Sequence, residues 1–311
     1  MRRIIILAAV VVPSIVSLPP TLAGAAFPGT NGKLVYWDFV GDPPQIFTID
    51  PDGTSRTRLT DSAKAVIADP AWSADGTRIA FTRYVVNTGA SSLRVMDQDG
   101  SNVKLVVNLD DLPSGFVFIS QPAWSPDGTT LAFCAFKTPA FENRIFTIGT
   151  DGSGLTKLSG PDDDDCFPAW SPDGMTIAVE SLDDTFNGDI VLLSVDGSTR
   201  TPIVTAADTH APNWDPTGAA LTFTRRTNKR FDVYTVDADG SNLTQVTHTV
   251  KRWEFAPVWS PDGTRIAFSR TVGTSSLTLS DLWTIAVDGS DAQRVKHTPG
   301  VDERDVDWQA A

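Results

Sequence analysis

The sequence is poor in histidine, cysteine and positive charge. It has three His and two Cys, and 25 Lys and Arg stand against 38 Asp and Glu, which gives a formal net charge of −13. A nucleic-acid-binding surface needs clustered positive charge, and so does docking on an anionic membrane. We therefore expect neither nucleic acid nor a membrane surface as a partner.

Two catalytic motifs are also missing. The chain has no Gly-x-Ser-x-Gly pentapeptide, which a hydrolase domain of the serine peptidase type requires. It has no Ser-x-Asp-x-Gly box of the kind found in sialidases, because Gly directly follows Asp in its turns. Beyond the N-terminal segment no stretch shows a sustained helical period, so the sequence predicts an all-β protein.

The N-terminal segment has the pattern of a signal peptide. Arg2 and Arg3 precede an apolar run over residues 4–12, and small residues close the segment near Ala25 and Ala26. The apolar run is shorter than the roughly 20 residues that span a bilayer. We expect residues 1–26 to be cleaved, residues 27–311 to form the mature domain, and the protein to be exported without a membrane span to an extracellular, periplasmic or cell-wall space.

What the sequence has in abundance is an internal repeat. A tryptophan followed by a Ser-Pro-Asp-Gly turn, or a variant of it, recurs along the chain, and the last copy stops at the chain end. The tryptophans are Trp72, Trp124, Trp170, Trp214, Trp259 and Trp308. Their successive spacings are 52, 46, 44, 45 and 49 residues, near the period of a four-stranded propeller blade.

Each repeat alternates short apolar strands with two kinds of turn. An Ile-Ala-Phe-like strand follows the first turn, and an alternating strand such as Val233–Asp237 leads to a second turn at an Asp-Gly pair. Asp folds its side chain back on the backbone, and Gly accepts the left-handed conformation of a tight turn. The pattern predicts six blades of four antiparallel strands.

The strands at the two chain ends together make up one complete repeat. The first Ile-Ala-Phe-like strand, residues 33–36, has no tryptophan strand before it, and the strand of Trp308 has nothing after it. We therefore predict that the C-terminal strand pairs with residues 32–37 and closes the ring, so that no sheet edge is left open between the ends.

The repeats resemble those of the TolB-type WD40-like propeller family, also called PD40. The matching features are Pro-x-Trp-Ser-Pro-Asp-Gly, the Ile-Ala-Phe that follows, and the Asp-x-Asp-Gly-Ser turns, over about residues 27–311. The resemblance implies a rigid scaffold that hosts many functions. TolB carries an additional α/β domain for which this chain has no room, so we do not expect its role in binding the Pal lipoprotein.

Loop lengths point to one face of the predicted disc. The turns between first and second and between third and fourth strands are short and uniform, and we call their side the turn face. The other loops vary in length and share the opposite side, the variable-loop face, where binding surfaces usually lie. Binding candidates there are Arg225, Arg226, Arg230 and Trp253, with solvated loops as the alternative reading.

Metal binding is a weaker hypothesis. His210, His248 and His297 each fall in a different repeat, so we expect isolated histidines rather than a convergent metal site. Five residues before each tryptophan, three repeats carry an acid: Asp165, Glu254 and Glu303. We expect these acids around the mouth of a central channel, as an acidic funnel that could hold Ca²⁺ through oxygen ligands, or else as carboxylates pointing to solvent.

The two cysteines, Cys134 and Cys166, fall on adjacent predicted blades. Cys134 ends a second strand and Cys166 enters a tryptophan strand, so a disulfide is possible if their Cα atoms lie within about 7 Å; two unpaired thiols are the alternative. Taken together, the sequence favours an exported, monomeric, non-catalytic scaffold without a cofactor that binds a protein or glycan. A carbohydrate lyase or lactonase-like hydrolase using the channel is the alternative.

Overall fold

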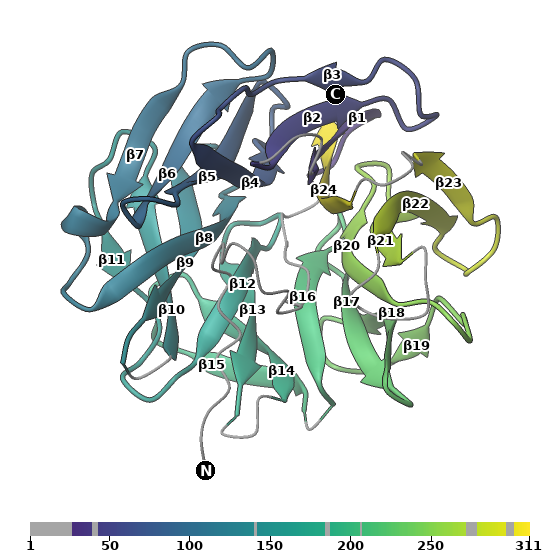
Figure 1. Ribbon diagram of the computed structural model, residues 1–311. Coiled ribbons are helices and arrows are strands. Elements are labelled where there is room, and N and C mark those ends of the chain that lie inside the picture. The colour runs from purple at the N-terminus through teal and green to yellow at the C-terminus, as the bar shows by residue number, and fades with distance from the viewer. Residues whose placement is uncertain are drawn as a thin grey trace.

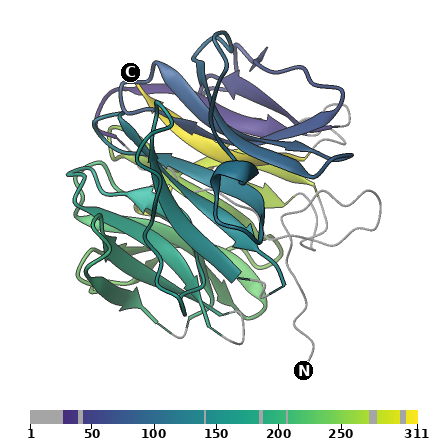
Figure 2. The ribbon, with the colours of Figure 1, turned by 90° about the vertical axis from the view of Figure 1, so that its left-hand side faces the viewer.

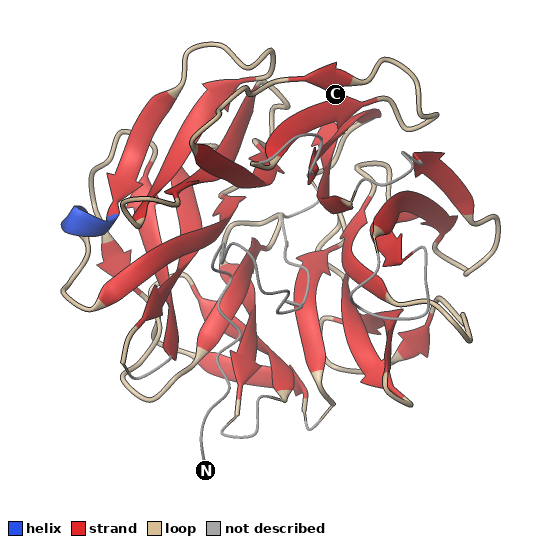
Figure 3. Ribbon diagram, viewed as in Figure 1, coloured by secondary structure: helices blue, strands red, loops and turns tan. Residues whose placement is uncertain are grey.

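The computed structural model describes residues 27–38, 43–139, 142–183, 187–205, 207–271, 279–296 and 302–311. The predicted signal peptide and His297 lie outside these residues. Six four-stranded antiparallel sheets surround a common axis, like the blades of a propeller (Figure 1). Apart from one short 3-10 helix at Leu109–Asp111, the described elements are strands (Figure 3). Within the described residues, no helix has the length and apolar content needed to cross a membrane.

The blades are numbered from the N-terminus, and in each the strands are given from the innermost to the outermost. Blade 1 consists of β24 (Glu303–Ala310), β1 (Asn31–Asp38), β2 (Gln45–Ile49) and β3 (Thr57–Arg58). Blade 2 consists of β4 (Ala65–Trp72), β5 (Arg78–Val85), β6 (Ala90–Asp97) and β7 (Lys104–Asn108). Blade 3 consists of β8 (Phe116–Trp124), β9 (Thr130–Lys137), β10 (Glu142–Gly149) and β11 (Thr156–Lys157).

The second half of the ring follows the same order. Blade 4 consists of β12 (Asp165–Trp170), β13 (Thr176–Leu182), β14 (Gly188–Ser194) and β15 (Arg200–Val204). Blade 5 consists of β16 (Thr209–Trp214), β17 (Ala220–Thr227), β18 (Arg230–Asp237) and β19 (Thr244–Gln245). Blade 6 consists of β20 (Glu254–Trp259), β21 (Arg265–Thr271), β22 (Ser280–Ala286) and β23 (Gln293–Lys296).

The ring closes as the sequence predicts. The C-terminal strand β24 is the innermost strand of blade 1 and pairs antiparallel with β1, so that Leu34 lies opposite Trp308 and Asp38 opposite Glu303. In the side view the yellow C-terminal strand lies among the purple and blue strands of the N-terminal part (Figure 2). The closing strand thereby covers the inner edge of β1, which would otherwise be unpaired.

The core lies between neighbouring sheets. Alternate side chains of each strand face the next blade, so the apolar clusters bridge neighbouring blades; Trp72 of blade 2, for example, packs with Val35 and Ile46 of blade 1. The indole N–H of Trp124 donates to the Ala71 carbonyl of the preceding blade at 3.0 Å. Each sheet face is therefore stabilised by its neighbour, and no blade has an apolar core of its own.

The Asp-Gly turns explain why so many acids occur on this chain. In the turn after Trp72, the Asp75 carboxylate accepts hydrogen bonds from the Ser73 hydroxyl at 2.6 Å and the Thr77 backbone N–H at 3.1 Å. Gly76 has φ +65°, and a Cβ there would lie 2.2 Å from the Ala310 carbonyl oxygen. The Asp75 carboxylate is thus bound within its own turn, and position 76 requires glycine.

Each innermost strand also contains a bulge that the sequence did not indicate. The residue three positions before every tryptophan has a left-handed φ near +50°, and most pairings shift register there. These residues are Asp69, Gln121, Phe167, Ala211, Ala256 and Asp305. A β-bulge bends a strand and increases its twist. The repetition in all six blades shows that the ring imposes this conformation on whatever residue stands there.

Candidate functional site

The position five residues before each tryptophan connects neighbouring blades. In every case it is linked to the third strand of the preceding blade, or to the residue just before that strand, by a hydrogen bond made directly or through a hydroxyl group. The six residues are Ile67, Ile119, Asp165, Thr209, Glu254 and Glu303. In blade 5, for instance, the Thr209 hydroxyl donates to the Gly188 carbonyl of blade 4 at 2.7 Å. This position is therefore an inter-blade link, whichever residue occupies it.

Asp165 begins β12 and is fully buried. It accepts a hydrogen bond from the Ser159 hydroxyl at 3.0 Å, and Ser159 in turn accepts from the Ile145 backbone N–H of β10 at 2.8 Å. Arg200 binds both carboxylate oxygens, at 2.7 and 2.9 Å. A buried charge needs such partners because its desolvation is otherwise costly. The carboxylate is thus committed to the boundary between blades 3 and 4.

Glu254 begins β20 in the same way. The Thr247 hydroxyl donates to it at 3.3 Å, the Thr249 hydroxyl at 2.7 Å, and Arg270 at 3.0 Å. Burial raises the pKa of Glu254 to about 7, against the lowering effect of Arg270. The Arg270 guanidinium lies over the Trp283 ring, 4.4 Å from the ring centre, and this cation–π contact helps to fix its position.

Glu303, the third acid, begins β24. It is fully buried, and its carboxylate accepts from the Leu282 backbone N–H of blade 6 at 3.4 Å. The acids do begin innermost strands, but the acidic funnel is wrong, and so is the alternative of carboxylates that point to solvent. Each carboxylate turns into a different blade boundary. Among the described residues, no group of three or more His, Cys, Asp or Glu is placed to hold a metal ion.

The partner residues Ser159, Thr247, Arg200 and Arg270 were not recognised from the sequence. The hydroxyl residues had a signal: Thr60, Ser159 and Thr247 occupy the same place after the outermost strands of blades 1, 3 and 5. In all three blades the hydroxyl oxygen accepts a hydrogen bond from a backbone N–H of the third strand. Arg200 and Arg270 had no such periodic signal.

The expectation of an isolated loop residue is wrong for His210, which lies in β16. Its ring nitrogens lie 2.8 Å from a Glu180 oxygen of blade 4 and 2.9 Å from an Asp208 oxygen. The two carboxylates outweigh the effect of burial and raise the pKa of His210 to about 10. A charged imidazolium thus joins blades 4 and 5. His248, by contrast, is exposed, so the described histidines do not converge.

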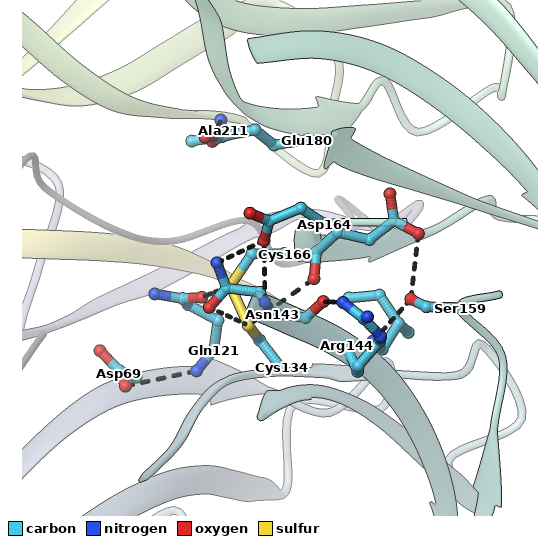
Figure 4. The surroundings of a disulfide bond; sticks show 12 residues. Asp69, Gln121, Cys134, Asn143, Arg144, Ser159, Asp164, Cys166, Glu180 and Ala211 are labelled. Atoms are coloured by element: carbon cyan, nitrogen blue, oxygen red, sulfur yellow. Dashed lines mark hydrogen bonds between the residues drawn. A yellow bond between two sulfur atoms is a disulfide. The ribbon is translucent and has the colours of Figure 1, made fainter. Parts of the chain in front are cut away.

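Cys134 and Cys166 form a disulfide between blades 3 and 4, with Cα atoms 5.2 Å apart. Cys134 lies inside β9 rather than at its end, and Cys166 is the second residue of β12. Both strands are longer than their sequence patterns suggested. Figure 4 shows the disulfide below Asp164, whose carboxylate accepts from the backbone and side-chain nitrogens of Asn143 at 2.8 and 2.9 Å.

The basic candidates lie on one hairpin of the variable-loop face. Strands β17 and β18 are joined by Asn228 and Lys229, both with positive φ, as a two-residue type I′ turn requires. Arg226 is about half exposed, and its Nε lies 2.5 Å from Asp208. Arg230 is half-buried at the start of β18. Arg225 lies on the hairpin face opposite to Arg226, where its guanidinium is 5.7 Å from the centre of the Tyr234 ring.

Trp253 joins this hairpin to the connection between blades 5 and 6. Its ring lies 5.4 Å from the ring of Phe231 and 6.0 Å from that of Phe255. Trp253 is itself half-buried, and next to it Lys251 is exposed and Val250 is 72 % exposed. The structure thus brings Trp253 to the hairpin face that carries Arg226 and Phe231. It leaves the other predicted binding residues outside this surface: Arg225, Arg230, Asp165, Glu254 and Glu303.

Comparison with known proteins agrees with this architecture. A family model described as the TolB beta propeller domain matches residues 38–310. The Tol-Pal system protein TolB of Francisella tularensis subsp. mediasiatica is 25% identical over 243 residues, which are 76% of this chain and 54% of that protein. Matches to the first curated relatives span 16% to 54% of their own length.

Two solved structures share the fold. TolB from Acinetobacter baumannii superposes with a TM-score of 0.72 at 17% identity, covering 91% of this chain and 68% of that one. A putative TolB from Agrobacterium tumefaciens superposes with a TM-score of 0.70 at 15% identity, covering 89% of this chain and 99% of that one. At these identities the likeness concerns the fold alone.

Proposed function

Because the chain belongs to the family of TolB β-propeller domains, we propose that it is an exported binding scaffold that recognises a protein partner at its variable-loop face without catalysing a reaction there. Export is supported by the signal-like residues 1–26 and by the Cys134–Cys166 disulfide, since disulfides persist in oxidising compartments. Curated relatives are named as TolB proteins of the Tol-Pal system.

The observation that carries the proposal is the difference between the two faces. On the turn face the acids are occupied within their own turns: Asp127 accepts from the Ser125 hydroxyl at 2.6 Å and from the Thr129 backbone N–H at 3.0 Å. Hydrogen bonds from Ser194 and Ser198 lower the pKa of Asp196 to about 2. These acids stabilise turns rather than face a partner.

The variable-loop face presents cationic and apolar groups around Trp253 instead, as described above. Trp and Arg are the residues most enriched at the energetic centres of protein interfaces. The enzyme alternative, a lyase or hydrolase centred on the axis, is not favoured by the described histidines, since His210 is held between two carboxylates and His248 is exposed.

Site-specific photo-crosslinking tests the proposal. A photoreactive residue in place of Lys229 or Lys251, both exposed on the variable-loop face, should capture the same protein from the exported fraction. The matched position is Lys157, exposed on the outermost strand of blade 3, which should not capture it. Capture from position 157 alone, or from none of the three positions, would contradict the proposal. Capture of glycan in place of protein would contradict the choice of partner.

A further inference from the structure

We infer that one patch on the variable-loop face, formed by Arg226, Lys229, Val250, Lys251 and Trp253, binds an acidic peptide segment of the partner protein. We call these five residues the cation–aromatic patch. The inference rests on the proposed function and specifies the chemistry of the partner.

The patch consists of two chain segments held together by aromatic contacts. Phe231, the residue after Arg230, lies at 5.4 Å from Trp253 and 5.6 Å from Phe255, measured between ring centres. His210 also packs against Phe231 at 5.1 Å, edge to face. Aromatic pairs at these separations add to the stability of the packing. The hairpin and the blade-to-blade connection therefore form one surface with a fixed base.

The backbone of the patch is also fixed. The backbone N–H of Trp253 donates to the Thr271 hydroxyl at 3.0 Å, and the Trp253 carbonyl accepts from the Thr271 backbone N–H at 2.9 Å. The Arg226 N–H donates to the Asp208 carbonyl at 2.9 Å, while the Arg226 guanidinium contacts the Asp208 carboxylate. A preorganised surface loses less conformational entropy when it binds.

The charge of the patch is opposite to that of the molecule. The exposed side chains of Lys229 and Lys251 carry positive charge in a chain with a net charge of −13. Arg226 is also exposed, although its guanidinium already contacts the Asp208 carboxylate. The surrounding negative charge would repel an acidic segment from other parts of the surface. The charge of the patch therefore determines both which segment binds and where it binds.

The exposed apolar groups favour a peptide over an anionic glycan. Val250 is 72 % exposed beside Lys251, and the half-buried Trp253 already packs against Phe231 and Phe255. An aliphatic side chain next to cations complements a peptide that carries both carboxylates and an apolar residue. A uronic acid chain would satisfy the cations but would leave Val250 without an apolar partner. The observations therefore favour an acidic peptide with at least one apolar side chain.

Fluorescence anisotropy with a defined probe tests the inference. The probe is a short labelled peptide of Asp and Glu that carries one Leu and one Phe, and the reference is the same peptide with Asn and Gln in place of the acids. We expect the acidic peptide to bind the full chain and the reference to bind at least about tenfold more weakly. Binding should weaken with added salt, since ionic strength screens exposed charges.

Variants locate the binding. Lys229→Glu/Lys251→Glu should weaken binding of the acidic peptide at least about tenfold, and Trp253→Ala should weaken it as well. The control Lys104→Glu/Lys157→Glu makes the same charge change at exposed positions of blades 2 and 3 and should leave binding unchanged. Because both double variants alter only exposed lysines, their melting curves should match that of the parent.

Three outcomes would overturn the inference: equal binding of the two peptides, equal loss in the control variant, or binding of polygalacturonate or heparin but not of the acidic peptide. If position 229 or 251 captures a protein by crosslinking while the acidic peptide fails to bind, the scaffold function stands and the acidic partner is wrong. If crosslinking captures nothing and the peptide also fails, both proposals are wrong.

Discussion

Asp307 of the closing strand accepts a hydrogen bond from the backbone N–H of Trp72 at 2.7 Å, across the boundary between blades 1 and 2. In blade 5 the equivalent residue is Asn213, which accepts from the Trp259 N–H at 2.9 Å. The same inter-blade bond is therefore made once by a carboxyl and once by a neutral amide. Burial raises the pKa of Asp307 to about 7.

The raised pKa of Asp307 predicts that the free energy of unfolding depends on pH. The unfolded carboxyl has its ordinary pKa near 4, so folding favours the protonated form. The stability from this preference is complete below about pH 4 and is lost as the pH rises to about 7. Asp307→Asn keeps the acceptor and should gain stability relative to the parent at pH 8 but not at pH 4, by an amount on the order of a few kcal/mol.

Urea unfolding at the two pH values measures this difference. The reciprocal variant Asn213→Asp should show the opposite behaviour, with stability that falls between pH 4 and pH 8 relative to the parent. A pH-independent difference between Asp307→Asn and the parent would contradict the assignment of the effect to this carboxyl.

The Asp165 link should be one of the stronger single contributions to the boundary between blades 3 and 4. Asp165→Ala leaves Ser159 and the half-buried Arg200 without their acceptor, so we expect a loss of about 2–4 kcal/mol in the free energy of unfolding. Asp162→Ala, in the same acidic run but exposed, should change it by less than about 0.5 kcal/mol. Equal effects of the two variants would contradict the link.

His210 should stabilise the boundary between blades 4 and 5 as a cation. Its pKa of about 10 lies above the ordinary value of 6.5, so its contribution is complete below about pH 6.5 and is lost as the pH rises through about 10. His210→Gln leaves the buried Glu180 carboxylate without its cation, while Asp208 keeps Arg226, and should cost about 3–5 kcal/mol at pH 6, with a smaller difference at pH 10.5. Denaturant titrations at both pH values measure this.

The matched control for that experiment is His248→Gln. His248 is exposed, and its replacement should change the free energy of unfolding by less than about 0.5 kcal/mol at either pH. If His210→Gln behaved like His248→Gln, the imidazolium would not be part of the blade boundary.

The disulfide should be complete and stabilising. Unfolded, unreduced protein should show no free thiol, because Cys134 and Cys166 are bonded. The bond closes a loop with a sequence separation of 32, so Cys134→Ala/Cys166→Ala should lose about 3–4 kcal/mol on the chain-entropy model. Reductant should destabilise the parent and leave the double variant unchanged. Two titratable thiols in the parent would overturn the assignment.

The sequence by itself determined the fold. Tryptophan spacing, Asp-Gly turns and strand alternation are local signals that recur in each repeat, because every blade faces the same packing problem. Even the ring closure followed from them, since residues 33–36 lacked an inner strand and the strand of Trp308 lacked an outer one. Local signals of this kind can be recognised in a single sequence because turn chemistry acts within a few residues.

Only the tertiary structure decided what the charged side chains do. Asp165, Glu254 and Glu303 were placed correctly at the starts of innermost strands, yet their carboxylates turn into blade boundaries. Their partners lie on other strands, such as Arg200 on β15 and Leu282 on β22. Burial without a partner is too costly for a carboxylate, but the identity of that partner depends on which strands the ring brings together, and no local pattern encodes it.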